Sequence, residues 1–164
     1  MTYIIYILLG TCSPNANSSD LEHNFRDLAA RNCLVSQDEV VKVGDLGMAR
    51  HMYTSNFYLA QSNHSMPIRW MAPESISDRT FTSQSDVWSY SVVLWEIATL
   101  AEIPYQAKTN EEVMFYVKSG GSLQFPENCP DIFQSLALKC WKTVPDSRPM
   151  FLDVCKYVPK KSFA

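Results

Sequence analysis

One continuous apolar segment, Ser85–Thr99, constrains the fold of this chain more than any other feature. It contains DVWSYSVVLWEIAT, which is apolar on nearly every side of a helical wheel. A surface helix keeps one polar side, so a helix of this composition is typical of a position that is buried on all faces. We therefore expect the helix over 85–99 to be the axis of a hydrophobic core, with the other elements packed around it.

Size, charge and cysteine content favour one intracellular domain. The chain has 164 residues, enough for a single domain with one core. Its 14 Lys and Arg against 17 Asp and Glu give a formal charge of -3, so we expect no general attraction to nucleic acid or anionic lipid. The five cysteines include no C-x-x-C pair and cannot all pair within one chain, which indicates reduced thiols and argues against zinc.

The N-terminal residues include an apolar run, Tyr3–Leu9. This run is far shorter than the ~20 residues that a membrane-spanning helix needs, and no Lys or Arg precedes it as in a secretory signal. We expect no membrane anchor in this chain and a cytoplasmic location. Residues 1–12 fit either one short buried strand or an apolar helical turn, and the SPNANSSD that follows is typical of a loop.

Three more helices are expected around the segment 85–99. Thr109 stands three residues before Glu112 in TNEEVMFYV, which is a capping-box start. Apolar side chains on one side predict a helix over Asp131–Trp141. A last helix fits Arg148–Tyr157, with Pro149 tolerated in its first turn.

A small hairpin and a long loop complete the expected fold. The β-branched runs Cys33–Val35 and Val40–Val43 flank SQDE and predict two antiparallel strands. From Gly47 to Pro73 no period is sustained, and a loop of that length inside a compact domain is usually functional. The expected fold class is therefore mainly α, with one small hairpin beside a long loop.

The stretch FRDLAARNCLV, Phe25–Val35, carries the candidate catalytic groups. It places Asp27 five residues before Asn32, and Asp45 follows the second predicted strand directly. Phosphoryl transfer needs a group that takes or orients a hydroxyl proton and oxygen ligands for magnesium. One hairpin can bring these three side chains together at a magnesium–phosphate site. Taken alone, Asp-x-x-x-x-Asn is more often turn chemistry than catalysis.

Several motifs in order resemble the catalytic lobe of protein kinases. FRDLAARN is followed by DLG and then by APE at Ala72–Glu74. The LAAR form and PIRWMAPE at Pro67–Glu74 are similar to the tyrosine-specific branch. The segments KVGDLGMAR, SDVWSYSVVLWEIATLAEIPYQ and FPENCP most resemble receptor tyrosine kinases of the insulin receptor type. The resemblance covers residues 25–158, and several ordered motifs are far more specific than any one of them.

The resemblance implies a truncated α+β kinase fold, namely the helical C-terminal lobe with a catalytic-loop hairpin. It implies that Asp27 is the catalytic base toward a substrate tyrosine hydroxyl, and that Arg31 is the basic residue on the substrate side. Asn32 and Asp45 would be ligands of the magnesium ion in bound Mg-ATP. Protein tyrosine substrates, or the parent kinase itself, are the expected partners.

The resemblance also implies structural and regulatory roles. Glu74 and Arg148 would form a buried ion pair, and Asp86 would brace the catalytic loop from the central helix. Tyr53 and Tyr58 stand where the insulin receptor type carries activation-loop tyrosines, so both are candidate phosphorylation sites.

The sequence departs from the kinase pattern in several places. No G-x-G-x-x-G loop, V-A-I-K lysine or glutamate-bearing helix lies upstream of residue 25. Phe25 stands where the pattern has histidine, Leu46 replaces the Phe of D-F-G, and Ser91 and Ala107 replace glycines. Because the lobe that cradles ATP is expected to be missing, we predict no kinase activity for this chain alone.

The expected organisation has three parts. Residues 1–24 form an irregular segment that is either a remnant strand with a loop or unrelated sequence. Residues 25–158 are the kinase C-terminal lobe, and 159–164 are a frayed tail. Without its missing neighbours the helix over 85–99 would leave an apolar patch uncovered, which favours self-association.

Three functional readings remain open. The first is a fragment of a receptor tyrosine kinase domain whose full, plasma-membrane form transfers the γ-phosphoryl group of Mg-ATP to protein tyrosines. The second is a non-catalytic decoy that binds substrates or the parent kinase, and the third is a truncated gene product. The intact Asp27, Asn32 and Asp45 favour recent descent from an active parent, whereas the missing phosphate loop argues against activity here.

Overall fold

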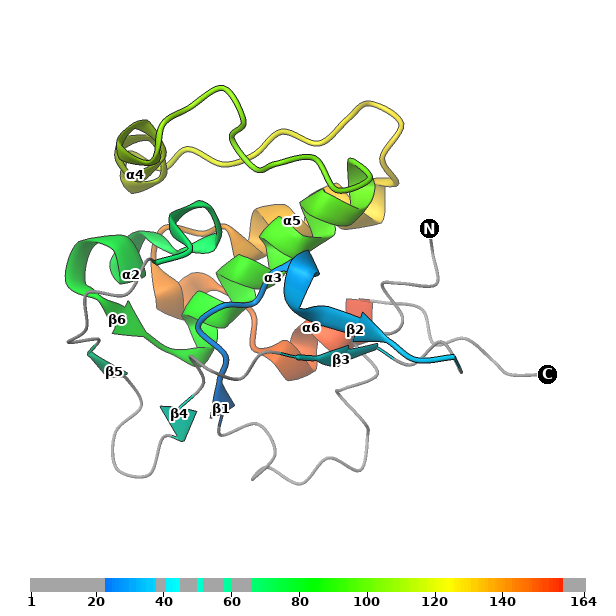
Figure 1. The fold of residues 1–164 in the computed structure, drawn as a ribbon, viewed down its shortest axis with the longest axis horizontal. Helices are drawn as coiled ribbons and strands as arrows, with labels where there is room; N and C mark the ends of the chain where they lie inside the picture. The colour runs from blue at the N-terminus through cyan, green and yellow to red at the C-terminus, as the bar shows by residue number, and fades with distance from the viewer. Residues whose placement is uncertain (1–22, 38–40, 45–49, 52–57, 60–65, 158–164) are drawn as a thin grey trace.

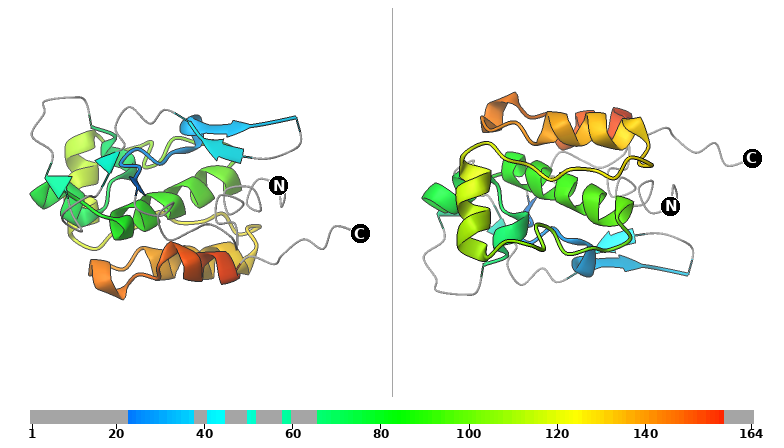
Figure 2. Two further views of the ribbon diagram at one scale, coloured as in Figure 1. Left: turned by 90° about the horizontal axis from the view of Figure 1, so that it is seen from below. Right: turned by 90° about the horizontal axis from the view of Figure 1, so that it is seen from above.

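The structure, a computed structural model, describes these parts of the chain: residues 23–37, 41–44, 50–51, 58–59 and 66–157. One helix, α3 (Ser83–Ala98), runs through the middle of the molecule (Figure 1). On one side of α3 lie the paired strands β2 (Cys33–Val35) and β3 (Val41–Val43) (Figure 2). On the other side lie α5 (Asp131–Cys140) and α6 (Phe151–Tyr157).

The central helix α3 is buried along almost its whole length. Thr82 caps it, because its hydroxyl accepts a hydrogen bond from the backbone N–H of Ser85, while the Ser85 hydroxyl accepts one from the Thr82 N–H. Every residue from Ser85 to Ala98 is buried. The predicted all-round burial is confirmed, and the helix begins at Ser83 rather than at Ser85.

Two of the surrounding helices follow the sequence prediction closely. α4 (Asn110–Lys118) begins with the predicted capping box: the Thr109 hydroxyl accepts from the Glu112 N–H, and Glu112 Oε2 accepts from the Thr109 N–H at 2.7 Å. α5 begins at the predicted residue. The helix α2 (Pro73–Asp78) was not predicted, because its six residues are too few to show a helical period.

The predicted start of the last helix was wrong. α6 begins at Phe151, not at Arg148, and it is preceded by a 3-10 turn, η5 (Pro145–Ser147). Arg148 has an extended backbone, with φ -83° and ψ 148°. The residue before a proline is disfavoured in the helical region, and Pro149 follows Arg148 directly.

The strands form three antiparallel pairs of two strands each. β2 pairs with β3 in the register Cys33↔Val43, which confirms the predicted hairpin. The other pairs join β1 (His23–Asn24) to β4 (Arg50–His51) and β5 (Tyr58–Leu59) to β6 (Thr80–Phe81). β4 and β5 lie in the segment for which the sequence predicted a loop, because a strand of two residues shows no alternation.

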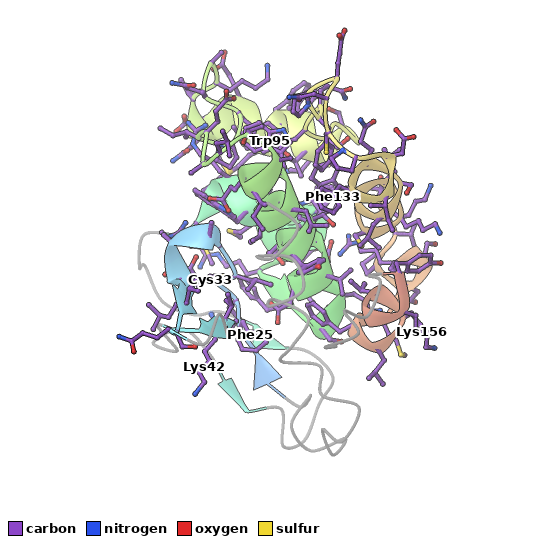
Figure 3. All side chains as sticks on the ribbon, turned by 90° about the vertical axis from the view of Figure 1, so that its right-hand side faces the viewer. Phe25, Cys33, Lys42, Trp95, Phe133 and Lys156 are labelled. Carbon is purple, nitrogen blue, oxygen red and sulfur yellow. The ribbon has the colours of Figure 1, made fainter. Side chains whose placement is uncertain are left out.

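Residues on different faces of α3 belong to two separate hydrophobic clusters. One joins Val87, Tyr90 and Leu94 of α3 to Phe133 and Leu136 of α5. The other gathers α3, α4 and the end of α5, with Trp88, Trp95, Val113, Val117, Ala137 and Trp141 among its members. Figure 3 labels Trp95 and Phe133, one from each cluster. The three tryptophans of the second cluster are all buried.

The expected apolar patch on α3 is not found, since this helix is covered along Ser85–Ala98. Exposed large apolar side chains lie instead on β2, α4, α5, α6 and the loops: Leu34, Val35, Leu100, Ile103, Phe115, Ile132, Leu138, Val144, Met150, Leu152 and Tyr157. In the described ranges, no helix is both long and apolar enough to cross a membrane.

Candidate active site

The loop that carries Asp27 is held at its start by a carboxylate of α3. Asp86 Oδ2 accepts a hydrogen bond from the Phe25 N–H at 2.8 Å, and Asp86 Oδ1 accepts one from the Arg26 N–H at 3.0 Å. Arg26 has φ 63°, a left-handed conformation that L residues rarely adopt. The two oxygens of one buried carboxylate therefore hold the turn just before Asp27.

Burial raises the pKa of Asp86 to about 7, and this effect outweighs the two backbone hydrogen bonds and the charge of Arg26, which lower it. Phe25, labelled in Figure 3, replaces the histidine of the kinase pattern. Its ring packs against the cluster that contains Val87 and Leu94, while its backbone N–H supplies one of the bonds to Asp86.

Three of the predicted site residues come together in this loop. Arg31 Nη2 pairs with Asp27 Oδ1, and Asn32 Nδ2 donates to the Asp27 carbonyl at 2.7 Å. The Arg31 side chain is 44% exposed and the Asp27 side chain 15%. Asn32 is buried, and its backbone carbonyl accepts a hydrogen bond from the Gly44 N–H, which links the loop to the end of β3. The carboxylate of Asp27 is thus partly buried and lies beside a cation.

A second carboxylate of α3, Glu96, was missed in the sequence. Its Oε2 accepts a hydrogen bond from the Ala30 N–H at 3.0 Å and another from the Trp70 indole N–H at 2.9 Å. Burial raises the pKa of Glu96, while these two hydrogen bonds and Arg31 lower it. An acidic residue inside an otherwise apolar helix was the available signal, because a buried carboxylate needs partners.

The segment after the long loop is fastened to the same helix and to a neighbouring loop. The Ser89 hydroxyl donates to the Trp70 carbonyl at 2.7 Å. Arg69, which the sequence did not single out, donates to three backbone carbonyls, those of Pro104, Tyr105 and Lys108. The guanidinium of Arg31 lies over the Trp70 ring, 4.4 Å from its centroid.

Glu74 and Arg148 are also brought together. Arg148 Nη1 and Nη2 donate to the two carboxylate oxygens of Glu74 at 2.7 and 2.8 Å, a bidentate pair. The Arg148 side chain is fully buried and donates further to the carbonyls of Lys142, Gln84 and Thr143. The pair ties α2 to the segment between α5 and α6.

The remaining predicted site residues lie outside the part of the chain that can be described. These are Asp45 and Tyr53, and the side chain of Tyr58, whose backbone belongs to β5. Over the described positions, no group of three or more His, Cys, Asp or Glu side chains is placed to hold a metal ion. Asn32 uses its amide nitrogen to bind the Asp27 carbonyl, which leaves the amide oxygen as the atom that suits magnesium.

Comparison with known proteins gives a consistent result. The family model for protein tyrosine and serine/threonine kinases matches residues 19–158. Insulin-like growth factor 1 receptor of Xenopus laevis is 53% identical over 129 residues, which are 79% of this chain and 10% of that receptor. Insulin receptor of Xenopus laevis gives the same values. Insulin-like receptor of Drosophila melanogaster is 50% identical over 133 residues, 81% of this chain and 6% of that protein. The chain therefore spans a small part of these relatives.

Proposed function

The chain belongs to the protein tyrosine and serine/threonine kinase family, and we propose that residues 25–158 form the C-terminal lobe of a tyrosine-specific kinase domain. The full protein is a receptor of the insulin type, with this lobe inside the cell. Its reaction moves the γ-phosphoryl group of Mg-ATP to the hydroxyl of protein tyrosines. The relationship to insulin and insulin-like growth factor 1 receptors at about half identity supports this choice.

The arrangement of Asp27, Arg31 and Asn32 carries the proposal. Asp27 accepts the proton of the tyrosine hydroxyl while the phenolic oxygen bonds to the γ-phosphorus and the bond to the β-phosphate oxygen breaks. Arg31, paired with Asp27, presents its cation on the substrate side. Magnesium, when bound, neutralises charge on the triphosphate. Asn32 and Asp45 are its proposed ligands.

The other assigned residues hold this lobe together or regulate it. Asp86 braces the turn before Asp27, and the buried pair of Glu74 and Arg148 fixes the end of the activation segment. Tyr53 and Tyr58 are phosphorylated when the receptor is active. Mass spectrometry of the receptor from stimulated cells tests this regulation, and finding both tyrosines unmodified there would remove it.

This chain alone does not transfer phosphate. Its sequence holds no G-x-G-x-x-G loop and no V-A-I-K lysine to position the nucleotide. Incubation of the purified chain with magnesium, radiolabelled ATP and a tyrosine peptide should give no labelled peptide. Labelling that is abolished by Asp27→Asn would overturn the proposed inactivity.

A chimaera tests the catalytic role of the lobe separately. Residues 25–158 would replace the matching segment in the kinase domain of the Xenopus laevis insulin-like growth factor 1 receptor. We expect tyrosine labelling by this chimaera and its loss, by about a hundredfold or more, in the Asp27→Asn variant. A well-folded chimaera that labels the peptide equally with and without Asp27 would refute Asp27 as the base.

A further inference from the structure

Glu96 connects two segments that the proposed acceptor site requires but that lie far apart in the sequence. We propose that Glu96 is a positioning residue that couples the Asp27–Asn32 loop to the segment 66–72 and so sets where an acceptor tyrosine lies. This inference rests on the proposed function for the identity of the ligand, a peptide tyrosine. The coupling itself rests only on contacts within this chain.

One oxygen atom makes both connections. Glu96 Oε2 accepts from the Ala30 N–H at 3.0 Å and from the Trp70 indole N–H at 2.9 Å. Ala30 begins the 3-10 turn η2 (Ala30–Asn32), and Trp70 ends the turn η4 (Ile68–Trp70). Because the two donors share one acceptor atom, displacement of either turn strains the hydrogen bond to the other.

A closed circuit of contacts runs through this oxygen. From Glu96 the circuit passes to the Trp70 indole, whose ring lies under the guanidinium of Arg31. Arg31 pairs with Asp27, and the chain from Asp27 returns to the Ala30 N–H, which Glu96 holds. The orientation of the Asp27 carboxylate therefore depends on Trp70 through Arg31, although no hydrogen bond between Asp27 and Trp70 is needed.

The helix supplies a rigid base for this circuit. Ser89, two turns before Glu96 on α3, donates to the Trp70 carbonyl at 2.7 Å, so α3 holds both the backbone and the indole of Trp70. The charges of Arg31 and Asp27 act on the Glu96 carboxylate in opposite directions: Arg31 lowers its pKa and Asp27 raises it. What the geometry requires of residue 96 is an acceptor oxygen at the position of Oε2.

Three variants of the full chain test separately the acceptor oxygen of Glu96, the charge of Glu96 and the indole N–H of Trp70. Glu96→Gln keeps an acceptor oxygen and removes the charge, whereas Glu96→Met removes the acceptor at similar size. Trp70→Phe keeps a ring beneath Arg31 but lacks the indole N–H, and it tests the circuit if Glu96→Met does not fold. Thr99→Ala is the matched control, since Thr99 Oγ1 donates to two carbonyls of its own helix, those of Trp95 and Glu96, and takes no part in the contacts of Glu96 Oε2.

The experiment combines NMR with peptide binding on the 164-residue chain. In ¹H–¹⁵N spectra, Glu96→Met should shift the Trp70 indole and Ala30 amide signals together. Trp70→Phe should shift the signals of Asp27 and Arg31. Glu96→Met removes the acceptor of both hydrogen bonds, so affinity for a peptide with one tyrosine, relative to the same peptide with alanine, should fall by about tenfold. Glu96→Gln should stay within about twofold of the parent, and Thr99→Ala should match the parent.

Three outcomes overturn the proposal. The first is Trp70→Phe leaving the Asp27 and Arg31 signals at their parent positions. The second is Glu96→Gln losing affinity as fully as Glu96→Met. The third is a lower melting temperature in Glu96→Met with no change in the NMR signals or in peptide affinity, which would assign Glu96 a purely structural role. If the parent chain does not prefer the tyrosine peptide while the coupled NMR shifts are present, the coupling is supported and the acceptor site of the proposed function is refuted.

Discussion

The two buried carboxylates of α3 hold the same loop in different ways. Asp86, near the start of the helix, divides its donors: each oxygen accepts one backbone N–H, from Phe25 and Arg26. Glu96, near its end, collects two donors on one oxygen, one from the loop backbone and one from the Trp70 side chain. Asp86 therefore holds the turn at Arg26, which has a left-handed backbone, whereas Glu96 joins the Asp27–Asn32 loop to the segment that contains Trp70.

The difference teaches which substitutions each position tolerates. An amide has one oxygen and one NH₂ group, so it can replace a carboxylate that uses a single oxygen. It cannot replace a carboxylate that uses both, because the NH₂ group would then face a backbone N–H. The same chemical change, from carboxylate to amide, is therefore expected to be costly at Asp86 and mild at Glu96.

Among the substitutions, the largest effect is expected for Asp86→Ala. Both N–H groups of the turn, those of Phe25 and Arg26, lose their acceptor, and each unsatisfied buried donor costs about 1 to 3 kcal/mol. We expect the free energy of unfolding, measured by urea denaturation, to fall by about 3 kcal/mol. A fall below about 1 kcal/mol would show that water or another group satisfies the turn.

Asp86→Asn should produce an intermediate effect. One of the two hydrogen bonds survives and one donor faces the NH₂ group, so at about pH 8, where Asp86 is ionised in the folded chain, we expect a loss of about 1 to 2 kcal/mol in the urea experiment. Equal stability of Asp86→Asn and the parent would contradict the assignment of one donor to each oxygen.

The pH dependence of stability should also come from Asp86. Burial raises its pKa from the ordinary 3.8 to about 7. Between these two pH values, the Asp86 carboxyl group is therefore protonated in the folded chain and ionised in the unfolded chain. The free energy of unfolding should therefore fall as pH rises from about 4 to about 7, by up to about 1.4 kcal/mol per pH unit. Urea denaturation of Asp86→Asn in the same buffers gives the contribution of this group by difference. A parent that gains stability over this range relative to Asp86→Asn would contradict the sign.

The smallest effect is expected for Glu96→Gln. The amide oxygen can accept from both the Ala30 and the Trp70 N–H, so the free energy of unfolding should change by less than about 1 kcal/mol. Urea denaturation beside Glu96→Met is the measurement. A loss in Glu96→Gln as large as that in Asp86→Asn would remove the difference between the two carboxylates.

The sequence predicted those parts of the fold that depend on local pattern. The continuous apolar segment predicted the buried helix α3, and the spacing of Thr109 and Glu112 predicted the cap of α4. The predicted start of α6 at Arg148 was wrong, because Pro149 disfavours a helical backbone at the residue before it. The strands of two residues escaped prediction because they pair over long distances and show no period of their own.

The candidate site was predictable to a different extent. Motifs placed Asp27, Arg31 and Asn32 in one loop because they are neighbours in sequence. Trp70 and Glu96 escaped because their contacts join residues 26 and 66 positions apart, which no local pattern encodes. A carboxylate within an apolar helix indicates that partners exist, but not which ones.

Amide hydrogen exchange at three backbone positions tests most directly whether the carboxylates of α3 hold the Asp27 loop. In the full chain we expect the N–H groups of Phe25, Arg26 and Ala30 to be protected, because each donates to Asp86 or Glu96. Asp86→Ala should remove protection at Phe25 and Arg26 first, and Glu96→Met at Ala30. Exchange of all three in the parent at the rate of an unstructured peptide would contradict the anchoring of this loop.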